Sequence, residues 1–219
     1  VGARLMVRQN TEPRAVLLDG SKSHTDTYVY YKKTKPLLAA IREFSFDMAL
    51  GGARREEEKA RAKERIFSLR SEFGVWDPKR QRPEVWRLYN ARLAEGESMR
   101  VFPLSNWTEV DIWHYIKKEH IEVVPLYFAR AREVVVRDGV LLQVDQWTRP
   151  RKGEEVQTVM CRFRTLGCAP STGAVASRAT DVDGIIAELV ETKRSERHTR
   201  LIDRGGEASM EHKKREGHF

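Results

Sequence analysis

Short apolar runs alternate with amphipathic segments over the first half of the chain, and this alternation constrains the fold more than any other feature. Residues 4–8 have the composition of a strand, residues 36–44 place apolar side chains on one face of a helix, and residues 46–50 have the composition of a buried strand. Helices and short strands keep alternating up to about residue 116. Because parallel sheets are built this way, the first part of the chain predicts an α/β layer.

A strand and a capped helix are predicted near the middle of the chain. Residues 99–104 are typical of a strand. Thr108 follows as a helix N-cap, with Asp111 in the position of its capping partner. Val110, Trp113 and Ile116 then form the apolar stripe of a short helix.

A β-hairpin is the clearest prediction for the second half. The dipeptide Asp138-Gly139 stands between two apolar runs, residues 133–137 and 140–144. This arrangement is a strong short-range signal for two antiparallel strands joined by a tight turn. Residues 181–191 then predict a last amphipathic helix, ahead of a polar end.

The charge pattern excludes several functional classes. The 219 residues carry 40 Lys and Arg against 32 Asp and Glu, a net charge of +8, but basic side chains are mostly mixed with acidic ones. We therefore do not expect a nucleic-acid binder, which concentrates basic residues in one patch. No run approaches the roughly 20 apolar residues that cross a bilayer, so we expect no membrane segment and a cytoplasmic location.

The glycine pair after the strand at residues 46–50 is the most informative candidate site. Gly51 and Gly52 would let an anion approach the backbone at the carboxyl end of a strand, where open α/β sheets bind ligands. We expect the charged helix to begin directly at Arg54. Arg54 and Arg55 could then bind phosphate or sulfate through planar, bidentate contacts. A plain glycine turn remains an equal alternative from spacing alone.

Two further polar groups are candidates for the same anion. Lys22 and His24 follow the first predicted strand, although a surface loop explains them equally well. Arg162 and Arg164 lie two residues apart in an extended segment, so both could point to one side. From spacing alone, a half-buried edge strand with solvated arginines is the better interpretation of this pair.

Neither histidines nor cysteines predict a metal site. His114 and His120 are six positions apart, which suits neither a metal-binding pair on a helix nor a catalytic triad, so packing or surface positions are expected. Cys161 and Cys168 match neither zinc-binding nor Cys-x-x-Cys spacing. We expect them to be reduced, buried thiols.

Six segments in order along the whole chain carry a resemblance to a known family: residues 51–65, 76–79, 100–109, 125–127, 162–168 and 209–219. Together they resemble the small subunit of heterodimeric bacterial sulfate adenylyltransferase. That family is similar in fold to the phosphoadenylylsulfate reductases, in the adenine nucleotide α-hydrolase-like (PP-loop ATP pyrophosphatase) group. The resemblance implies that residues 1–128 are the remainder of a nucleotide-binding α/β domain and that residues 129–219 are an extension with the hairpin, a helix and a polar tail.

The resemblance also implies a reaction, in which sulfate is joined to the AMP part of ATP to give adenylyl sulfate and pyrophosphate. ATP would be a substrate with Mg²⁺, and a large partner subunit, a GTPase, would couple GTP hydrolysis to the step. By resemblance, Arg54 and Arg55 would be catalytic. Gly51 and Gly52 would face phosphates or sulfate.

The chain departs from the family pattern at its beginning. The family carries an upstream Ser-x-Gly-Lys-Asp-Ser loop that holds the phosphates of ATP, and this loop does not occur in the sequence. We therefore expect a sheet that is incomplete at the N-terminus, and a chain that alone does not form adenylyl sulfate. The alternatives are a non-catalytic partner of the GTPase subunit and a phosphoadenylylsulfate reductase-like protein. The second predicts a redox cysteine near the C-terminus, and none follows Cys168.

Overall fold

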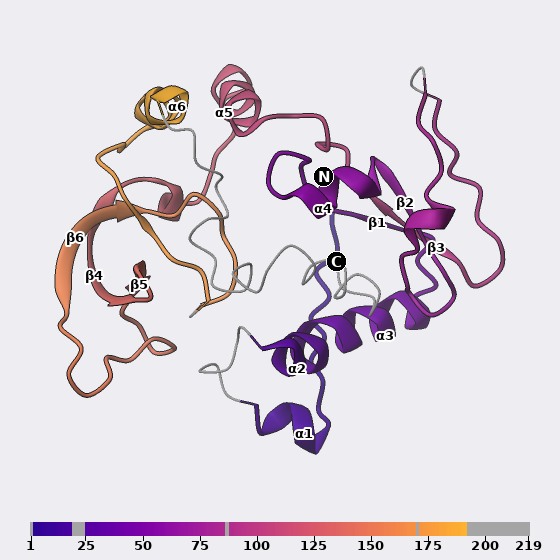
Figure 1. Cartoon of the computed structure of the whole chain (residues 1–219), viewed down its shortest axis with the longest axis horizontal. Helices are drawn as coiled ribbons and strands as arrows, with labels where there is room; N and C mark the ends of the chain where they lie inside the picture. Colours follow the sequence, from indigo (N-terminus) through magenta and orange to yellow (C-terminus); the bar gives the residue numbers. More distant parts are fainter. Residues whose placement is uncertain (1, 19–24, 86–87, 170, 192–219) are drawn as a thin grey trace. The chain divides into compact units, whose positions relative to one another are not determined.

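The computed structural model describes residues 2–18, 25–85, 88–169 and 171–191 (Figure 1). Lys22 and His24 lie outside these residues. The described chain forms two compact units. The first contains the residues up to Ala53 together with Ala60–Ser105, and the second contains Arg54–Lys59 and the residues from Asn106 onward. The predicted division at residue 128 stays a prediction, because compactness alone does not define a functional domain.

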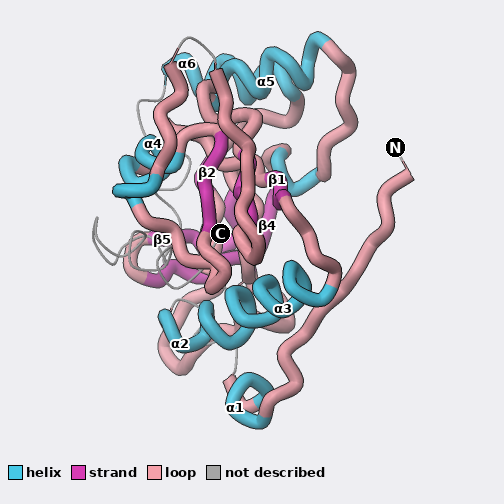
Figure 2. The backbone as a smooth tube through the Cα atoms, turned by 90° about the vertical axis from the view of Figure 1, so that its right-hand side faces the viewer, coloured by secondary structure: helices cyan, strands magenta, loops and turns pink. Residues whose placement is uncertain are grey.

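One nearly continuous helical rod dominates the first part of the first unit. It joins α2 (Asp26–Val29), a π-helical turn (Tyr30–Thr34) and α3 (Lys35–Glu43), as Figure 2 shows. Thr25 caps its start by accepting a hydrogen bond from the Tyr28 amide, at 3.2 Å. Pro36 stands in the first turn of α3, where a missing N–H does no harm. The predicted helix over residues 36–44 is therefore confirmed.

The predicted strand at residues 4–8 is wrong. Residues 2–11 are irregular, and a short helix, α1 (Pro13–Val16), follows them. Leu5 and Val7 are 87% and 73% exposed. Within the described residues this segment pairs with no strand, so its backbone groups have no ladder to join.

A small mixed sheet forms the centre of the first unit. Its strands are β1 (Met48–Leu50), β2 (Phe67–Arg70) and β3 (Ser98–Val101), in the order β1-β3-β2. β1 and β3 are parallel, as predicted for the strands at residues 46–50 and 99–104, whereas β2 is antiparallel to β3 and was not predicted. Buried side chains of Leu69, Met99 and Val101 form the apolar cluster of this unit.

Two helices pack together in the second unit. They are α5 (Glu109–Lys118) and α6 (Val182–Glu191), joined by a cluster that includes Trp113, Ile185 and Leu189. Thr108 and Asp111 form the predicted capping box at the start of α5. Both predicted helices are confirmed.

An antiparallel sheet completes the second unit, with the order β5-β4-β6-β7. Its strands are β4 (Arg130–Arg137), β5 (Val140–Gln143), β6 (Gln157–Arg162) and β7 (Val175–Ala176). Asp138 and Gly139 turn β4 into β5 with φ angles of 49° and 72°, so the predicted hairpin is confirmed. Short single-turn helices lie at Pro78–Arg80 and Pro125–Tyr127.

The predicted α/β class is confirmed, with parallel strands in one unit and the hairpin in a later sheet. None of the helices in the described part of the chain is long and apolar enough to span a bilayer.

Candidate functional site

The glycine pair follows β1 as predicted. The Gly51 amide continues the ladder by donating to the Val101 carbonyl, at 2.9 Å. A Cβ on Gly52 would meet no atom within 4 Å, so the backbone is open on that side. The predicted helix start at Arg54 is wrong, because α4 spans Lys59–Glu64. Residues 55–57 form a turn instead, in which the Glu57 amide donates to the Arg54 carbonyl at 3.3 Å.

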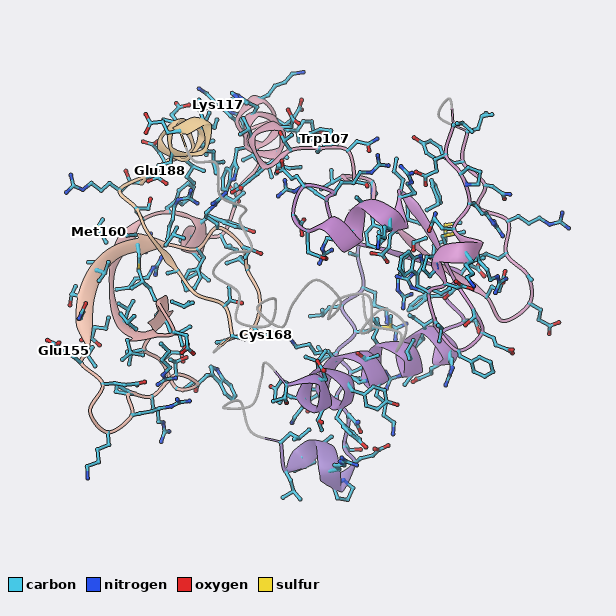
Figure 3. All side chains as sticks on the ribbon, viewed as in Figure 1. Trp107, Lys117, Glu155, Met160, Cys168 and Glu188 are labelled. Carbon is cyan, nitrogen blue, oxygen red and sulfur yellow. The ribbon has the colours of Figure 1, made fainter. Side chains whose placement is uncertain are left out.

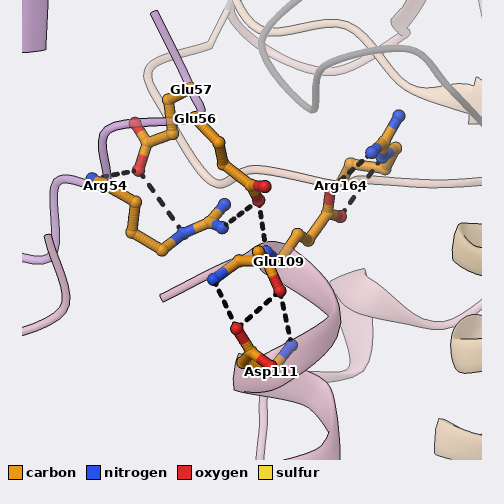
Figure 4. A network of polar contacts seen from close by, with 7 residues as sticks. Arg54, Glu56, Glu57, Glu109, Asp111 and Arg164 are labelled. Carbon is orange, nitrogen blue, oxygen red and sulfur yellow. Dashed lines mark hydrogen bonds and ion pairs between the residues drawn. The ribbon is translucent and has the colours of Figure 1, made fainter. Parts of the chain in front are cut away.

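Arg54 is buried and held by two carboxylates of its own turn (Figure 4). Its Nη1 lies 2.6 Å from Oε1 of Glu56, and its Nε lies 3.7 Å from Oε1 of Glu57. The backbone amide of Arg54 donates to the same Glu57 oxygen, at 2.9 Å. The guanidinium is therefore fixed in place, although its charge is already balanced by acidic neighbours. Arg55 beside it is half-buried.

Glu56 and Glu109 extend this arrangement to Arg164, as Figure 4 shows. Glu56 also accepts a hydrogen bond from the backbone amide of Glu109, the first residue of α5. The Glu109 carboxylate in turn binds Arg164 through both oxygens, one from Nε at 3.2 Å and one from Nη2. A hydrogen bond from the Thr108 hydroxyl lowers the pKa of Asp111. Glu109 and Asp111 therefore place two carboxylates in the first turn of α5, where negative charge interacts favourably with the helix dipole.

Arg162 has a different carboxylate partner. It ends β6, is almost completely buried, and donates from Nε to Glu188 on α6, at 2.9 Å. The other oxygen of Glu188, a residue labelled in Figure 3, accepts a hydrogen bond from the Ser177 hydroxyl. Nη1 of Arg162 is buried without a hydrogen-bond partner. The expectation that Arg162 and Arg164 are solvated is wrong, because both are buried and each is paired with a carboxylate far away in the sequence.

The remaining candidates occupy ordinary positions. His114 and His120 are exposed, as expected for surface histidines. Both cysteines are free. Cys161 is buried as expected, and burial raises the pKa of its thiol. The expectation of burial is wrong for Cys168, which is half-buried in a loop (labelled in Figure 3). Among the residues that the structure describes, no group of three His, Cys, Asp or Glu side chains is placed to hold a metal.

A buried polar cluster in the first unit was not anticipated. Arg70 on β2 donates to Glu64 at 2.5 Å and to Ser68 at 2.8 Å, and Arg100 on β3 lies opposite Ser68. Burial and the positive charge of Arg70 lower the pKa of Arg100 to about 10. The alternation of polar and apolar residues along both strands would have placed these side chains on one face. It would not have shown that this face is buried.

Each unit contains a cavity among its described residues. The cavity in the first unit is about 340 Å³ and is lined by α3 and by residues at the amino ends of β1 and β3, including Asp47 and Ser98. It is therefore at the opposite end of these strands from the glycine pair. The cavity in the second unit is about 180 Å³ and lies beside Gln143 and Thr172.

Comparisons with known proteins agree with this fold. Residues 4–174 match the family described as phosphoadenosine phosphosulfate reductase domain. The chain is 53% identical to sulfate adenylyltransferase subunit 2 of Myxococcus xanthus (strain DK1622) over 219 residues, which are 100% of this chain and 72% of the relative. It is 57% identical over 201 residues to the protein of that name from Bacteroides fragilis (strain YCH46), covering 91% of this chain and 65% of the relative. For the protein of that name from Burkholderia lata the identity is 59% over 201 residues, covering 91% and 66%. The chain thus spans about two thirds to three quarters of the length of these relatives.

Proposed function

The chain belongs to the family of sulfate adenylyltransferase subunit 2 proteins. We propose that it is a subunit of a nucleotidyltransferase that makes adenylyl sulfate and pyrophosphate from ATP and sulfate. The observation that carries the proposal is the identity of more than half of the aligned residues over nearly the whole chain. The fold supports it, since open α/β sheets bind nucleotides beyond the carboxyl ends of parallel strands.

Arg54 and Arg55 are the proposed catalytic residues. As pyrophosphate departs, negative charge builds around the α-phosphorus, and fixed positive charge lowers the free energy of that transition state. The support from the structure is the immobilised guanidinium of Arg54, held by Glu56 and Glu57. Gly52, two residues before Arg54, leaves the backbone open to an anion, because a Cβ there would meet no atom within 4 Å. We propose that Mg²⁺ arrives bound to the phosphates of ATP, which is how this ion usually enters such sites.

A partner subunit is part of the proposal. The relatives carry the name subunit 2, and we propose that the partner is a large GTPase subunit that couples GTP hydrolysis to adenylyl sulfate formation. The reaction would belong to cytoplasmic sulfate assimilation and would supply sulfur for cysteine biosynthesis. A non-catalytic role beside the same GTPase is the alternative, and it predicts binding without turnover.

A reductase function is the weaker alternative. The match to the phosphoadenosine phosphosulfate reductase domain favours it. However, a redox cysteine needs an accessible thiolate, and burial raises the pKa of Cys161. Cys168 is the other cysteine of the sequence, and it is half-buried in a loop.

Pyrophosphate release measures the proposed activity. The chain, fused to the upstream loop segment that the family carries, would be co-expressed with the large subunit and assayed with ATP, sulfate and GTP. The chain without that segment is assayed beside it, and we expect no release from it. Arg54→Lys and Arg55→Lys should each lower turnover at least about tenfold, as the loss of a bidentate charged contact worth about 1.5–3 kcal/mol would.

Arg178→Lys is the matched control, since Arg178 is exposed in the second unit. Wild-type turnover in both test variants would refute the catalytic assignment. If the fused complex binds its partner but releases no pyrophosphate, the non-catalytic alternative holds.

A further inference from the structure

The two carboxylates that hold Arg54 differ in their exposure to water. The side chain of Glu57 is 8% exposed and that of Glu56 is 41% exposed, whereas the side chain of Arg54 is 5% exposed. A buried carboxylate that lost its arginine would keep an uncompensated charge away from water, but a half-exposed one is rehydrated when it leaves. Of these two ion pairs, the one with Glu56 is therefore the easier to open.

The contacts of the two carboxylates with the turn differ as well (Figure 4). Glu57 accepts from the backbone amide of Arg54 at 2.9 Å and lies 3.7 Å from its Nε, and the Glu57 amide donates back to the Arg54 carbonyl. These contacts fix both the backbone and the Nε side of the guanidinium. Glu56 contacts Nη1 at 2.6 Å, and the same oxygen accepts from the backbone amide of Glu109. Loss of Glu56 would leave the turn intact, whereas loss of Glu57 would release the backbone of Arg54.

An oxyanion that binds Arg54 has to compete with these carboxylates. A guanidinium binds an oxyanion best through two neighbouring N–H donors in one plane. Nη1 and Nη2 are such a pair, at the end of the side chain, and the Glu56 oxygen already accepts from Nη1. With both carboxylates in place, the charge of Arg54 is also offset. Binding of the anion at this end of Arg54 therefore requires that Glu56 move away.

We propose that Glu56 is a displaceable partner of Arg54 and that Glu57 is its positioning residue. Glu56 covers the end of the guanidinium until a phosphate or sulfate oxygen arrives. The Glu56 carboxylate then rotates into water and the oxyanion takes its place on Nη1, while Glu57 keeps the guanidinium where it is. This inference rests on the proposed function, in which Arg54 contacts the reacting anion. It adds which neighbour sets the affinity of that contact and which one sets its geometry.

Pyrophosphate binding to the 219-residue chain tests the proposal without turnover. An NMR titration that follows the Nε–H signal of Arg54 gives the dissociation constant. Glu56→Gln keeps an acceptor for the Glu109 amide but removes the competing charge, so pyrophosphate should bind about three- to fivefold more tightly.

Replacing Glu57 should have the opposite effect, although it removes the same charge one position away. Glu57→Ala should weaken pyrophosphate binding about two- to fivefold, because Arg54 is no longer held in place for the anion. Glu57→Gln keeps an acceptor for the Arg54 amide and should restore at least the wild-type affinity. An effect of charge alone predicts tighter binding in all of these variants.

Two controls accompany these variants. Glu119→Gln removes an exposed carboxylate of the same unit. Glu119 follows the last residue of α5, roughly 15 Å along the helix from Glu109. At that distance salt of about 0.1 M screens exposed charges, so the affinity should change less than about 1.5-fold. Arg54→Met should weaken pyrophosphate binding and should abolish the gain from Glu56→Gln in a double variant.

Steady-state kinetics separate the two roles. In the fused complex with the large subunit, Glu56→Gln should lower the KM of ATP or of sulfate about three- to fivefold at unchanged kcat. The substrate whose KM responds is the one that meets Arg54. Glu57→Ala should lower kcat at least about tenfold, because a misplaced arginine no longer follows the charge of the transition state.

The proposal is overturned if Glu56→Gln leaves pyrophosphate affinity unchanged, or if Glu56→Gln and Glu57→Ala shift it in the same direction. Because Glu56 is half-exposed, its variant decides the matter even where Glu57→Ala does not fold. Wild-type affinity in Arg54→Met would refute the proposed role of Arg54 and this inference with it. Weakened binding in Arg54→Met together with an unresponsive Glu56→Gln would overturn this inference alone.

Discussion

Replacing Glu188 with glutamine should destabilise the second unit strongly, because it leaves the buried guanidinium of Arg162 without its carboxylate partner. Glu188 is the carboxylate that accepts from Nε of Arg162, and the side chain of Arg162 is only 1% exposed. The same carboxylate accepts from the Ser177 hydroxyl and from the Arg178 amide. Glutamine keeps one accepting oxygen but turns an NH₂ group toward donors. It also removes the charge partner of a guanidinium whose Nη1 already lacks a hydrogen bond.

The size of the loss follows from this geometry. Removing one partner of a buried ion pair typically costs about 3–5 kcal/mol. The Glu188 side chain is 34% exposed, so water partly replaces it, and we expect about 3 kcal/mol. For a chain of this length that corresponds to a fall in melting temperature of about 6–12 °C. Thermal and urea unfolding followed by circular dichroism would measure both values.

Matched variants separate this explanation from general damage to α6. Glu191→Gln changes an exposed residue of the same helix and should cost less than about 0.5 kcal/mol. Combining Glu188→Gln with Arg162→Met removes both charges and should recover more than half of the loss. The reasoning is refuted if the two glutamine variants unfold together, or if the double variant is less stable than Glu188→Gln alone.

Two further predictions concern other parts of the fold. Gly74→Ala should lower the free energy of unfolding by about 1–3 kcal/mol in urea titrations, because Gly74 has a φ of 78° and the new Cβ would lie 2.4 Å from a methyl carbon of Leu38. A hydrogen bond from Arg137 lowers the pKa of Glu154 to about 2. The ionised Glu154 therefore contributes its full stabilisation above the unfolded pKa of about 4.3, and this contribution is lost as the pH falls toward 2. Glu154→Gln should accordingly weaken the pH dependence of the free energy of unfolding between these two values and leave it unchanged elsewhere.

Local signals in the sequence identified the elements that depend on neighbouring residues. The Asp138-Gly139 turn and the Thr108 cap each act within four positions, and both are present in the structure. The start of α4 was missed because Glu57 captures the Arg54 amide in a turn, an outcome that helix propensity does not include.

The arginine partners could not be predicted in the same way. Arg162 and Glu188 are 26 positions apart, and Arg164 and Glu109 are 55 apart. Nothing in the residues around either arginine indicates a carboxylate at such a distance. The strand β2 was missed for a related reason, since it is short and its partners on β3 are at least 28 positions away, Arg70 and Ser98 being the nearest pair.

The division of the chain into units has a consequence for how it can fold and be cut. Arg54–Lys59 belongs to the second unit, although residues on both sides of it belong to the first. Neither unit is therefore a contiguous piece of the sequence, and a fragment that starts at Asn106 would lack Glu56, which binds the first amide of α5. Because residues 54–59 and 60–105 belong to different units, each unit closes a chain loop that contains a segment of the other. Unfolding of one unit should therefore change the loop entropy of the other, and we expect the two units to open in coupled rather than independent steps.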